Sequence, residues 1–320
     1  MRAFQVDEIG QPPRLVDLPD PKPGPAQVTV GIEACGLNFA DLLMIKGKYQ
    51  DMPPAPFTLG MELAGTVRDC GSQVSTLKKG DRVAVFGGQG GLAERGVFDA
   101  DRCVKLDDRI SSQDAAALQI AYGTSHVALD YKARLQPGET LLVLGAAGGV
   151  GLTAVEVGKL MGARVIACAR GADKLDAARV AGADHLIDAK TEDIRAVCKE
   201  LGGLDVVYDP VGGDQFKAAF RACNPEARIL PIGFASGDVP QIPANHLLVK
   251  NITVMGLYWG GYLKFRPDVV TQSLETLLNW YETGKLKPHV SNILPLERAG
   301  EALELLQARK STGKVVVTPG

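Results

Sequence analysis

The stretch Thr-Leu-Leu-Val-Leu-Gly-Ala-Ala-Gly-Gly-Val-Gly at residues 140–151 decides the fold of this chain. Residues 140–144 form a short apolar run of the kind that builds a buried strand. A helical pattern follows at residues 152–161, so the glycine-rich segment lies at a turn between a strand and a helix. Such a turn is typical of a phosphate-binding site, because its backbone N–H groups can approach a ligand closely.

The spacing within this turn reads A-x-G-x-x-G, with Ala146, Gly148 and Gly151 at the three defining positions. The first lies in the tight turn, the second lets the backbone approach a pyrophosphate, and the third lets helix and strand pack closely. Gly149 and Val150 lie between these positions, and the helix that follows has first N–H groups that lack partners within the helix and carry a partial positive charge. These five residues therefore predict a dinucleotide-binding site.

From about residue 122 onward, apolar runs alternate with helical patterns such as those at 172–181 and 191–201. Strands that alternate with helices imply right-handed βαβ units and a parallel sheet, and six strands suit a complete doubly wound Rossmann sheet. The six apolar runs lie at 140–146, 164–169, 185–188, 205–209, 227–233 and 251–257.

The two ends of the chain show a different pattern. Proline and glycine divide the first part into short strands, with one helix near residues 38–46. The tail contains two helical patterns and two strand patterns, which have no place in a completed six-strand sheet. We therefore expect an α/β protein with a Rossmann domain at 122–264 and a discontinuous, mainly β catalytic domain at 1–121 and 265–320.

The residues after the second predicted strand indicate which dinucleotide binds. NAD enzymes usually place an Asp or Glu there to accept a hydrogen bond from the ribose 2′-hydroxyl. Here the strand ends in Ala169-Arg170, and Lys174 follows on the next helix. A guanidinium matches a 2′-phosphate with forked, charge-assisted hydrogen bonds, so Arg170 and Lys174 favour NADPH. Either residue could instead be an ordinary solvated side chain.

With these residues identified, the chain resembles the medium-chain dehydrogenase/reductase superfamily, and most closely its zinc-independent quinone oxidoreductase branch. The resemblance covers essentially the whole chain and implies a GroES-like catalytic domain made from both chain ends. It also implies a Rossmann domain between them, NADPH in the cleft and a homodimer. The motifs that carry it lie at 36–41, 60–65, 79–83, 146–151 and 311–315.

Zinc-containing members of this superfamily hold their metal with a Cys and a His at positions that match Asn38 and Met61 here. Asn38 is a poor zinc ligand, and a lone thioether lacks suitable partners. The structural zinc loop with four close cysteines is also missing, so we expect no metal. Reduction of an electrophilic quinone or enone needs no Lewis acid, because hydride adds to it directly.

Three residues are candidate catalytic groups. Asn38 and Asp41 are three apart on a predicted helix, and the resemblance places Asn38 near the nicotinamide ribose and the substrate. The same pair also fits a helix capping box, and the two roles can coexist. Tyr49 matches a tyrosine of the family's substrate pocket, where a phenol can donate a proton. A residue that only packs at the rim is the alternative.

The resemblance suggests further cofactor contacts by position. Thr124 matches a threonine near the phosphate end of the nicotinamide half. The last Rossmann strand leads to Tyr258, which lines the pocket or a dimer interface, with burial in the core as the alternative. One departure is Asp188-Ala189, where many relatives have Asn-Tyr near the adenosine phosphate. The remaining candidate cofactor contacts are Gly233, Phe234, Ala235 and Lys314.

Composition excludes several other classes of protein. The chain has 35 Lys+Arg and 37 Asp+Glu, a net charge of −2 that argues against a nucleic-acid binder. Its six cysteines are scattered, and no apolar run approaches the roughly 20 residues of a membrane span. With no secretory signal visible, we expect a cytoplasmic protein without nucleic-acid or membrane partners.

Three functions remain open at this point. The first is an NADPH-dependent reductase of a quinone or another α,β-unsaturated carbonyl compound, and the second is a 2-enoyl-thioester reductase with the same hydride geometry. The third is a non-catalytic, crystallin-like NADPH-binding protein. Retention of Asn38, Asp41 and Tyr49 argues against the third.

Overall fold

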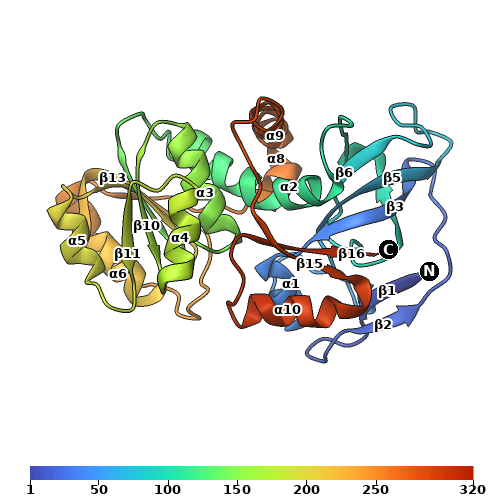
Figure 1. Ribbon diagram of the computed structural model, residues 1–320, viewed down its shortest axis with the longest axis horizontal. Helices are drawn as coiled ribbons and strands as arrows, with labels where there is room; N and C mark the ends of the chain where they lie inside the picture. Colours follow the sequence, from blue (N-terminus) through green and yellow to red (C-terminus); the bar gives the residue numbers. More distant parts are fainter. Residues whose placement is uncertain (320) are drawn as a thin grey trace. The chain divides into compact units, whose positions relative to one another are not determined.

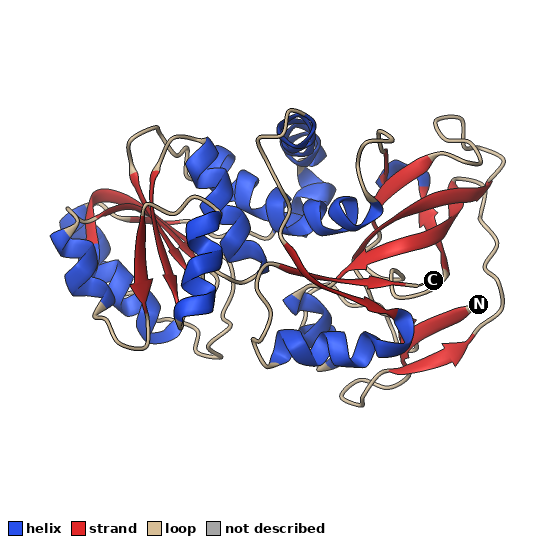
Figure 2. Cartoon of the chain, viewed as in Figure 1, coloured by secondary structure: helices blue, strands red, loops and turns tan. Residues whose placement is uncertain are grey.

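The computed structural model describes residues 1–319 and consists of two compact units. Met1–Ile120 and the C-terminal segment from Pro288 form the first unit, and Ala121–Lys287 form the second. Figures 1 and 2 show the helices and strands of both. Within the described residues, no helix combines the length and the apolar character that crossing a membrane requires.

The second unit contains the parallel sheet (Figure 1). Its strands have the spatial order β11-β10-β9-β12-β13-β14. Every pairing within it is parallel, so the predicted doubly wound sheet is confirmed. All five residues of β9 are buried, as expected of a central strand covered on both faces. The strands are β9 (Thr140–Leu144), β10 (Arg164–Ala169), β11 (His185–Asp188), β12 (Leu204–Asp209), β13 (Cys223–Pro231) and β14 (Thr253–Val254).

Helices cover both faces of this sheet, with α3 and α4 on one face and α5 and α6 on the other (Figure 2). Helix α2 begins in the first unit and continues into the second as a π-helical segment, Val127–Lys132. The helices are α2 (Ser112–His126), α3 (Gly149–Leu160), α4 (Ala172–Val180), α5 (Ile194–Glu200), α6 (Gly213–Ala222), α7 (Ala244–Lys250), α8 (Trp259–Phe265) and α9 (Pro267–Glu282).

The strand order determines where a nucleotide can bind in the second unit. Strands β10 and β12 lie on opposite sides of β9, so the direction of winding reverses at β9. Open α/β sheets bind ligands at the carboxyl ends of the strands beside such a reversal. The glycine-rich turn at 145–151 follows β9 directly and therefore lies at this edge.

The first unit is built on a three-stranded sheet, β2-β1-β4, and a larger sheet with the path β15-β16-β3-β5-β6-β8, in which β7 also pairs with β3. Its strands are β1 (Arg2–Val6), β2 (Arg14–Asp17), β3 (Gln27–Gly36), β4 (Phe57–Thr58), β5 (Glu62–Cys70), β6 (Arg82–Phe86), β7 (Arg95–Asp99), β8 (Cys103–Lys105), β15 (Val290–Pro295) and β16 (Lys314–Thr318). Its helices are α1 (Phe39–Ile45), α10 (Ala299–Gln307) and the 3-10 turns Ala100–Arg102 and Leu296–Arg298.

The C-terminal tail completes the larger sheet of this unit. Strand β16 pairs antiparallel with β3, with Val316 opposite Gly36. One apolar core joins the two chain ends, since Leu37 and Met61 pack in the same cluster as Val315. The expected discontinuous, mainly β domain is therefore confirmed.

Helix α9 belongs to the second unit, although the sequence analysis assigned residues 265–320 to the catalytic domain. The His126 Nδ1 and Ser273 Oγ atoms lie 3.0 Å apart, and the ring of Trp280 meets the His126 ring edge to face. The Glu156 carboxylate accepts the backbone N–H of Lys287 at 2.8 Å. These contacts hold α9 and the chain after it against α2 and α3.

Candidate active site

The glycine-rich turn after β9 leaves its outer face open. A Cβ on Gly151 would lie 2.2 Å from the Gly145 carbonyl oxygen, so only glycine fits where helix and strand pack. A Cβ on Gly148 would meet no described atom closer than that same oxygen, at 3.4 Å. The glycine at this second position therefore keeps clear the surface that a pyrophosphate would occupy.

The start of helix α3 supplies the hydrogen-bond donors of this turn. Gly148 is the N-cap of α3, and its own N–H donates to the Gly145 carbonyl at 3.0 Å. Gly149 and Val150 lie in the first helical turn, where N–H groups have no partner within the helix. Ala146 is tied to the neighbouring strand, since its N–H donates to the Cys168 carbonyl at 3.0 Å. The turn thus offers backbone donors at a fixed position, which fits the phosphates of a dinucleotide.

The end of β10 carries positive charge and no acid. Arg170 is exposed and forms no hydrogen bond or ion pair with any residue that the structure describes, and Lys174 lies half-buried on α4. Asp188, at the end of β11, accepts the Gly171 N–H at 3.2 Å. Hydrogen bonds from the Lys190 and Gly171 backbones lower the pKa of the Asp188 carboxyl, which stays ionised.

Thr124 is buried on α2 beside a cluster of hydroxyl groups that the sequence analysis did not identify. Ser125 Oγ donates to the Val150 carbonyl at 3.1 Å and lies 2.8 Å from Thr153 Oγ1 and 3.0 Å from Tyr208 Oη. The cluster ties α2 to the first turn of α3 and to β12. It therefore fixes the position of the phosphate-binding turn.

The loop at 233–235 lies at the same edge of the sheet. The Gly233 N–H donates to the Asp209 carbonyl at 3.3 Å, and the Ala235 N–H donates to the Pro210 carbonyl at 3.1 Å. Phe234 between them is exposed. This arrangement holds the loop against the end of β12, beside the glycine-rich turn.

Asp209 contributes an unusual buried carboxylate to this edge. Its Oδ1 accepts the N–H groups of Val211 and Gly212 at 2.7 and 2.9 Å. Its Oδ2 is buried without a hydrogen-bond partner among residues 1–319, and burial raises the pKa of the carboxyl. An orphaned oxygen at this position is a further sign that the edge accommodates a polar ligand.

Tyr258 and Trp259 lie at the start of α8. Tyr258 is the half-buried N-cap residue of this helix, and its ring lies over Gly260 and Gly261. Trp259 is buried and packs on α2, where a Cβ on Gly123 would come within 2.8 Å of its indole nitrogen. Trp259 is thus part of the packing that supports Thr124, the next residue of α2.

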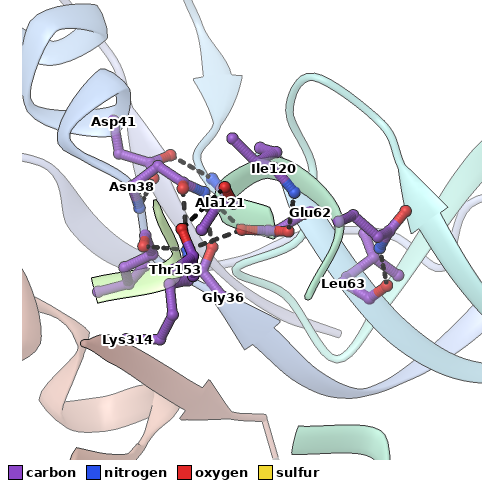
Figure 3. A network of polar contacts seen from close by, with 12 residues as sticks. Gly36, Asn38, Asp41, Glu62, Leu63, Ile120, Ala121, Thr153 and Lys314 are labelled. Carbon is purple, nitrogen blue, oxygen red and sulfur yellow. Dashed lines mark hydrogen bonds and ion pairs between the residues drawn. The ribbon is translucent and has the colours of Figure 1, made fainter. Parts of the chain in front are cut away.

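The first unit contains a buried polar network around Lys314 (Figure 3). Lys314 Nζ donates to the Leu37 carbonyl at 2.7 Å, to Asn38 Oδ1 at 2.8 Å and to Glu62 Oε1 at 2.7 Å. The Lys314 side chain is 3% exposed and that of Glu62 is 0% exposed. The second oxygen of Glu62 accepts the Ile120 N–H at 2.8 Å. Every hydrogen of the ammonium and both carboxylate oxygens therefore have partners inside the protein.

This network fixes the orientation of the Asn38 amide. Its Nδ2 donates to the Gly36 carbonyl at 3.2 Å and to Glu62 Oε1 at 2.9 Å, while its Oδ1 faces Lys314. Because an ammonium must face oxygen and a carboxylate must face the NH₂ group, the amide cannot flip. Both amide hydrogens donate hydrogen bonds, and one lone pair of Oδ1 remains available to accept one more.

Asp41 on α1 is fully buried and holds backbone groups. Its Oδ2 accepts the Asn38 N–H at 2.8 Å, and its Oδ1 accepts the Gly60 N–H at 3.2 Å. The first of these bonds is one half of the capping box considered from the sequence. Burial raises the pKa of the Asp41 carboxyl from 3.8 to about 6, although the two hydrogen bonds and Lys314 limit the rise. Glu62, which sequence reasoning missed as a site residue, lies in the quoted motif 60–65.

Tyr49 lies in the loop that follows α1. It is half-buried and packs against the same apolar cluster as Met61 and Val315. The structure therefore brings Asn38 into contact with both Asp41 and Lys314, and places Tyr49 at the border of the apolar core.

The residues at the two zinc-ligand positions do not suit a metal ion. Met61 is buried in the apolar core, and the Asn38 oxygen is bonded to a lysine ammonium that would repel a second cation. Within residues 1–319, no group of three or more His, Cys, Asp or Glu side chains is placed to hold a metal. The donor set therefore disagrees with the zinc chemistry of related dehydrogenases.

Comparisons with known proteins identify the family. Residues 24–108 match the family described as "Alcohol dehydrogenase GroES-like domain", and residues 149–279 match "Zinc-binding dehydrogenase". A quinone oxidoreductase-like protein 2 homolog of Nematostella vectensis is 43% identical, over 99% of this chain and 88% of its own length.

Solved structures agree with this assignment. A quinone oxidoreductase of Pseudomonas syringae superposes with a TM-score of 0.93 at 32% identity, covering 99% of both chains. Escherichia coli quinone oxidoreductase complexed with NADPH superposes with a TM-score of 0.90 at 29% identity, also covering 99% of both. The resemblance found in the sequence is confirmed, and the chain belongs to the quinone oxidoreductase-like oxidoreductases of the medium-chain dehydrogenase/reductase superfamily.

Proposed function

We propose that this protein transfers hydride from NADPH to a quinone or another α,β-unsaturated carbonyl compound, without a metal. The observation that carries the proposal is the nucleotide edge of the second unit. There the open glycine turn follows β9, and the neighbouring strand β10 ends at the exposed, unpaired Arg170. No acidic residue stands at the end of β10. The E. coli relative complexed with NADPH supports the same choice of cofactor.

The residues of the second unit would bind the cofactor. The N–H groups of Gly149 and Val150 suit the pyrophosphate, and Arg170 with Lys174 suits the 2′-phosphate. The 233–235 loop would line the nicotinamide half, as would Thr124. NADPH, when bound, supplies the hydride, so that a quinone and one proton become a hydroquinone while the cofactor is oxidised to NADP⁺.

The residues of the first unit would position and protonate the acceptor. Asp41 has both oxygens on backbone N–H groups, which supports a role in positioning Asn38 rather than contact with substrate. Lys314 has no free hydrogen, which likewise supports a positioning role and weighs against the direct cofactor contact that the sequence suggested. Asn38 is left with one acceptor lone pair, which suits a hydroxyl donor such as a ribose. Tyr49 is the proposed proton donor.

Kinetics of Tyr49→Phe would test this proposal and separate the acceptor classes. An enone or enoyl thioester must gain a proton at carbon after the hydride, whereas solvent can protonate the oxygens of a reduced quinone. We expect kcat on an enone or enoyl thioester to fall at least tenfold, about 1.4 kcal/mol of barrier, and kcat on a quinone to fall less than about threefold. Tyr281→Phe on α9 is the matched control.

The outcomes distinguish the possible roles of Tyr49 and the possible functions of the protein. Equal small losses on both acceptors would make Tyr49 a packing residue, and equal large losses would make it a general positioning group. A preference for enoyl thioesters across an acceptor panel would favour that reductase activity. No turnover of any acceptor would leave a binding protein.

We also propose that the second unit pairs with a second copy through the open edge of β14. Leu248 and Val249 on the neighbouring helix α7 are 78% and 76% exposed, an apolar surface that a partner would cover. Light scattering should give the mass of a dimer, and Leu248→Asp with Val249→Asp should shift it toward the monomer.

A cytoplasmic setting is proposed because all six cysteines are free thiols.

A further inference from the structure

The loops that follow β10 and β11 are neighbours at the nucleotide edge. The two strands pair in parallel, with Ala169 opposite Asp188. Arg170, the first residue after β10, and Lys190, the second residue after β11, therefore lie in neighbouring loops. They are 20 positions apart in the sequence, and only the register of the sheet brings them together.

Asp188 fixes the relative position of these two loops. Its Oδ1 accepts the Gly171 N–H at 3.2 Å and the Lys190 N–H at 3.0 Å. The Gly171 N–H, at the N-cap of α4, is thereby occupied and is not available to a ligand.

The Lys190 ammonium lies over Gly171. A Cβ built on Gly171 would come within 3.4 Å of Lys190 Nζ, and no other described atom outside the adjoining residues would come within 4 Å. Lys190 is exposed, and its ammonium has no hydrogen bond or ion pair among residues 1–319. Asp188 Oδ1 is held by two backbone N–H groups, and the Asp188 carboxylate acts on Lys190 only through electrostatic attraction. Lys190 therefore lies at the Gly171 turn, next in sequence to Arg170, and neither side chain forms a hydrogen bond or ion pair among residues 1–319.

We propose that Lys190 is a specificity-determining residue that binds the 2′-phosphate of NADPH together with Arg170. The end of the second strand is where a Rossmann site places the adenosine ribose, so a phosphate on that ribose comes to the Gly171 turn. A dianion there would meet the planar fork of Arg170 and the compact charge of Lys190. The inference rests on the proposed use of NADPH.

The absence of an aromatic residue agrees with this role. Position 189 is alanine, whose methyl group offers no stacking surface to the adenosine end of the cofactor. At the next residue, the positive charge of Lys190 would instead attract the 2′-phosphate, which NADPH carries and NADH lacks. Binding that depends on Lys190 should therefore weaken as salt is raised.

Titration calorimetry tests the proposal without turnover. Dissociation constants are measured for NADPH and NADH, and for the fragments 2′,5′-ADP and 5′-AMP. The proteins are the wild type, Lys190→Ala and Lys190→Glu. Alanine retains the backbone N–H that donates to Asp188, so the loop should keep its conformation. Lys199→Ala is the control, since Lys199 is exposed on α5 and lies near Cys223 at the opposite edge of the sheet.

We expect Lys190→Ala to weaken NADPH and 2′,5′-ADP by roughly 3- to 10-fold, as for an exposed ion pair with a dianion, and Lys190→Glu to weaken them further. NADH, 5′-AMP and the control variant should stay within about twofold of the wild type. Equal weakening of both cofactors, or no weakening, would overturn the role of Lys190 while leaving the proposed function intact. A wild type that binds neither cofactor, or prefers NADH, would overturn both.

Discussion

Two lysines of this chain, Lys314 in the first unit and Lys190 in the second, use the same side chain in opposite ways. Lys314 is buried, and all three of its hydrogens bond to the protein. Lys190 is exposed beside Gly171, with no ion pair in the described residues. A buried lysine with three partners stabilises a structure, whereas an unpaired lysine at a nucleotide edge remains available to a ligand. The family resemblance drew attention to the first of these lysines, and only the structure reveals the second.

The largest expected effect comes from removing the buried cation. Lys314→Met leaves the Glu62 carboxylate buried without its partner, and loss of one member of a buried ion pair typically costs about 3–5 kcal/mol. We expect the free energy of unfolding in urea to fall by this amount. Lys310→Ala, four residues earlier and exposed, is the control and should change it by less than about 0.5 kcal/mol.

A double variant separates the charge effect from lost packing. Lys314→Met with Glu62→Gln removes both charges and should recover part of the stability lost in the single variant. If the single variant loses less than about 1 kcal/mol of unfolding free energy, the two side chains do not form a buried, stabilising ion pair.

The next largest effect is a pH dependence of the free energy of unfolding that comes from Asp41. Its pKa is raised from 3.8 to about 6 in the folded protein, so the folded state binds this proton more tightly than the unfolded chain. Its stabilising contribution is therefore complete below pH 4 and declines until about pH 6, by about 3 kcal/mol. The stability difference between wild type and Asp41→Asn should change by this amount over that window. A difference that does not vary with pH would contradict the buried titration.

A smaller effect is expected from the exposed cations. Arg170→Ala should weaken NADPH by roughly 10-fold and leave NADH nearly unchanged, because a charge-assisted bond to phosphate is lost but is partly screened by solvent. Fluorescence titration of both cofactors measures it. The control is Arg179→Ala, because Arg179 lies on the following helix, α4, and pairs with Asp176. If both cofactors weaken together, Arg170 does not bind the 2′-phosphate.

The smallest expected effect is that of metal removal. Because Lys314 bonds to Asn38 where zinc-containing relatives have a ligand, dialysis against a chelator should leave the rate of NADPH oxidation unchanged. Elemental analysis of the purified protein should find zinc well below one equivalent. Stoichiometric zinc would contradict this reading of the first unit.

Local spacing made the nucleotide turn predictable from the sequence. Ala146, Gly148 and Gly151 lie within one strand-turn-helix segment, so their geometry depends on near neighbours. The lack of an acid at the end of β10 was visible for the same reason.

The remaining features depend on contacts between distant segments. Lys314 and Glu62 are 252 positions apart, and they meet only because the tail returns to the sheet of the first unit. Lys190 reaches Gly171 only through the β10–β11 register. The position of α9 depends on the contact between His126 and Ser273, which no periodicity reveals.

The central claim is that this protein is a metal-independent, NADPH-dependent reductase. The most direct measurement is anaerobic oxidation of NADPH, followed at 340 nm, by the purified protein with a 1,4-benzoquinone in the presence of a chelator. We predict repeated turnover, with one hydroquinone formed for each NADPH consumed and much slower oxidation of NADH. If NADPH binds but its oxidation does not exceed the uncatalysed rate with this quinone, or with enones and enoyl thioesters under the same conditions, the reductase assignment is wrong.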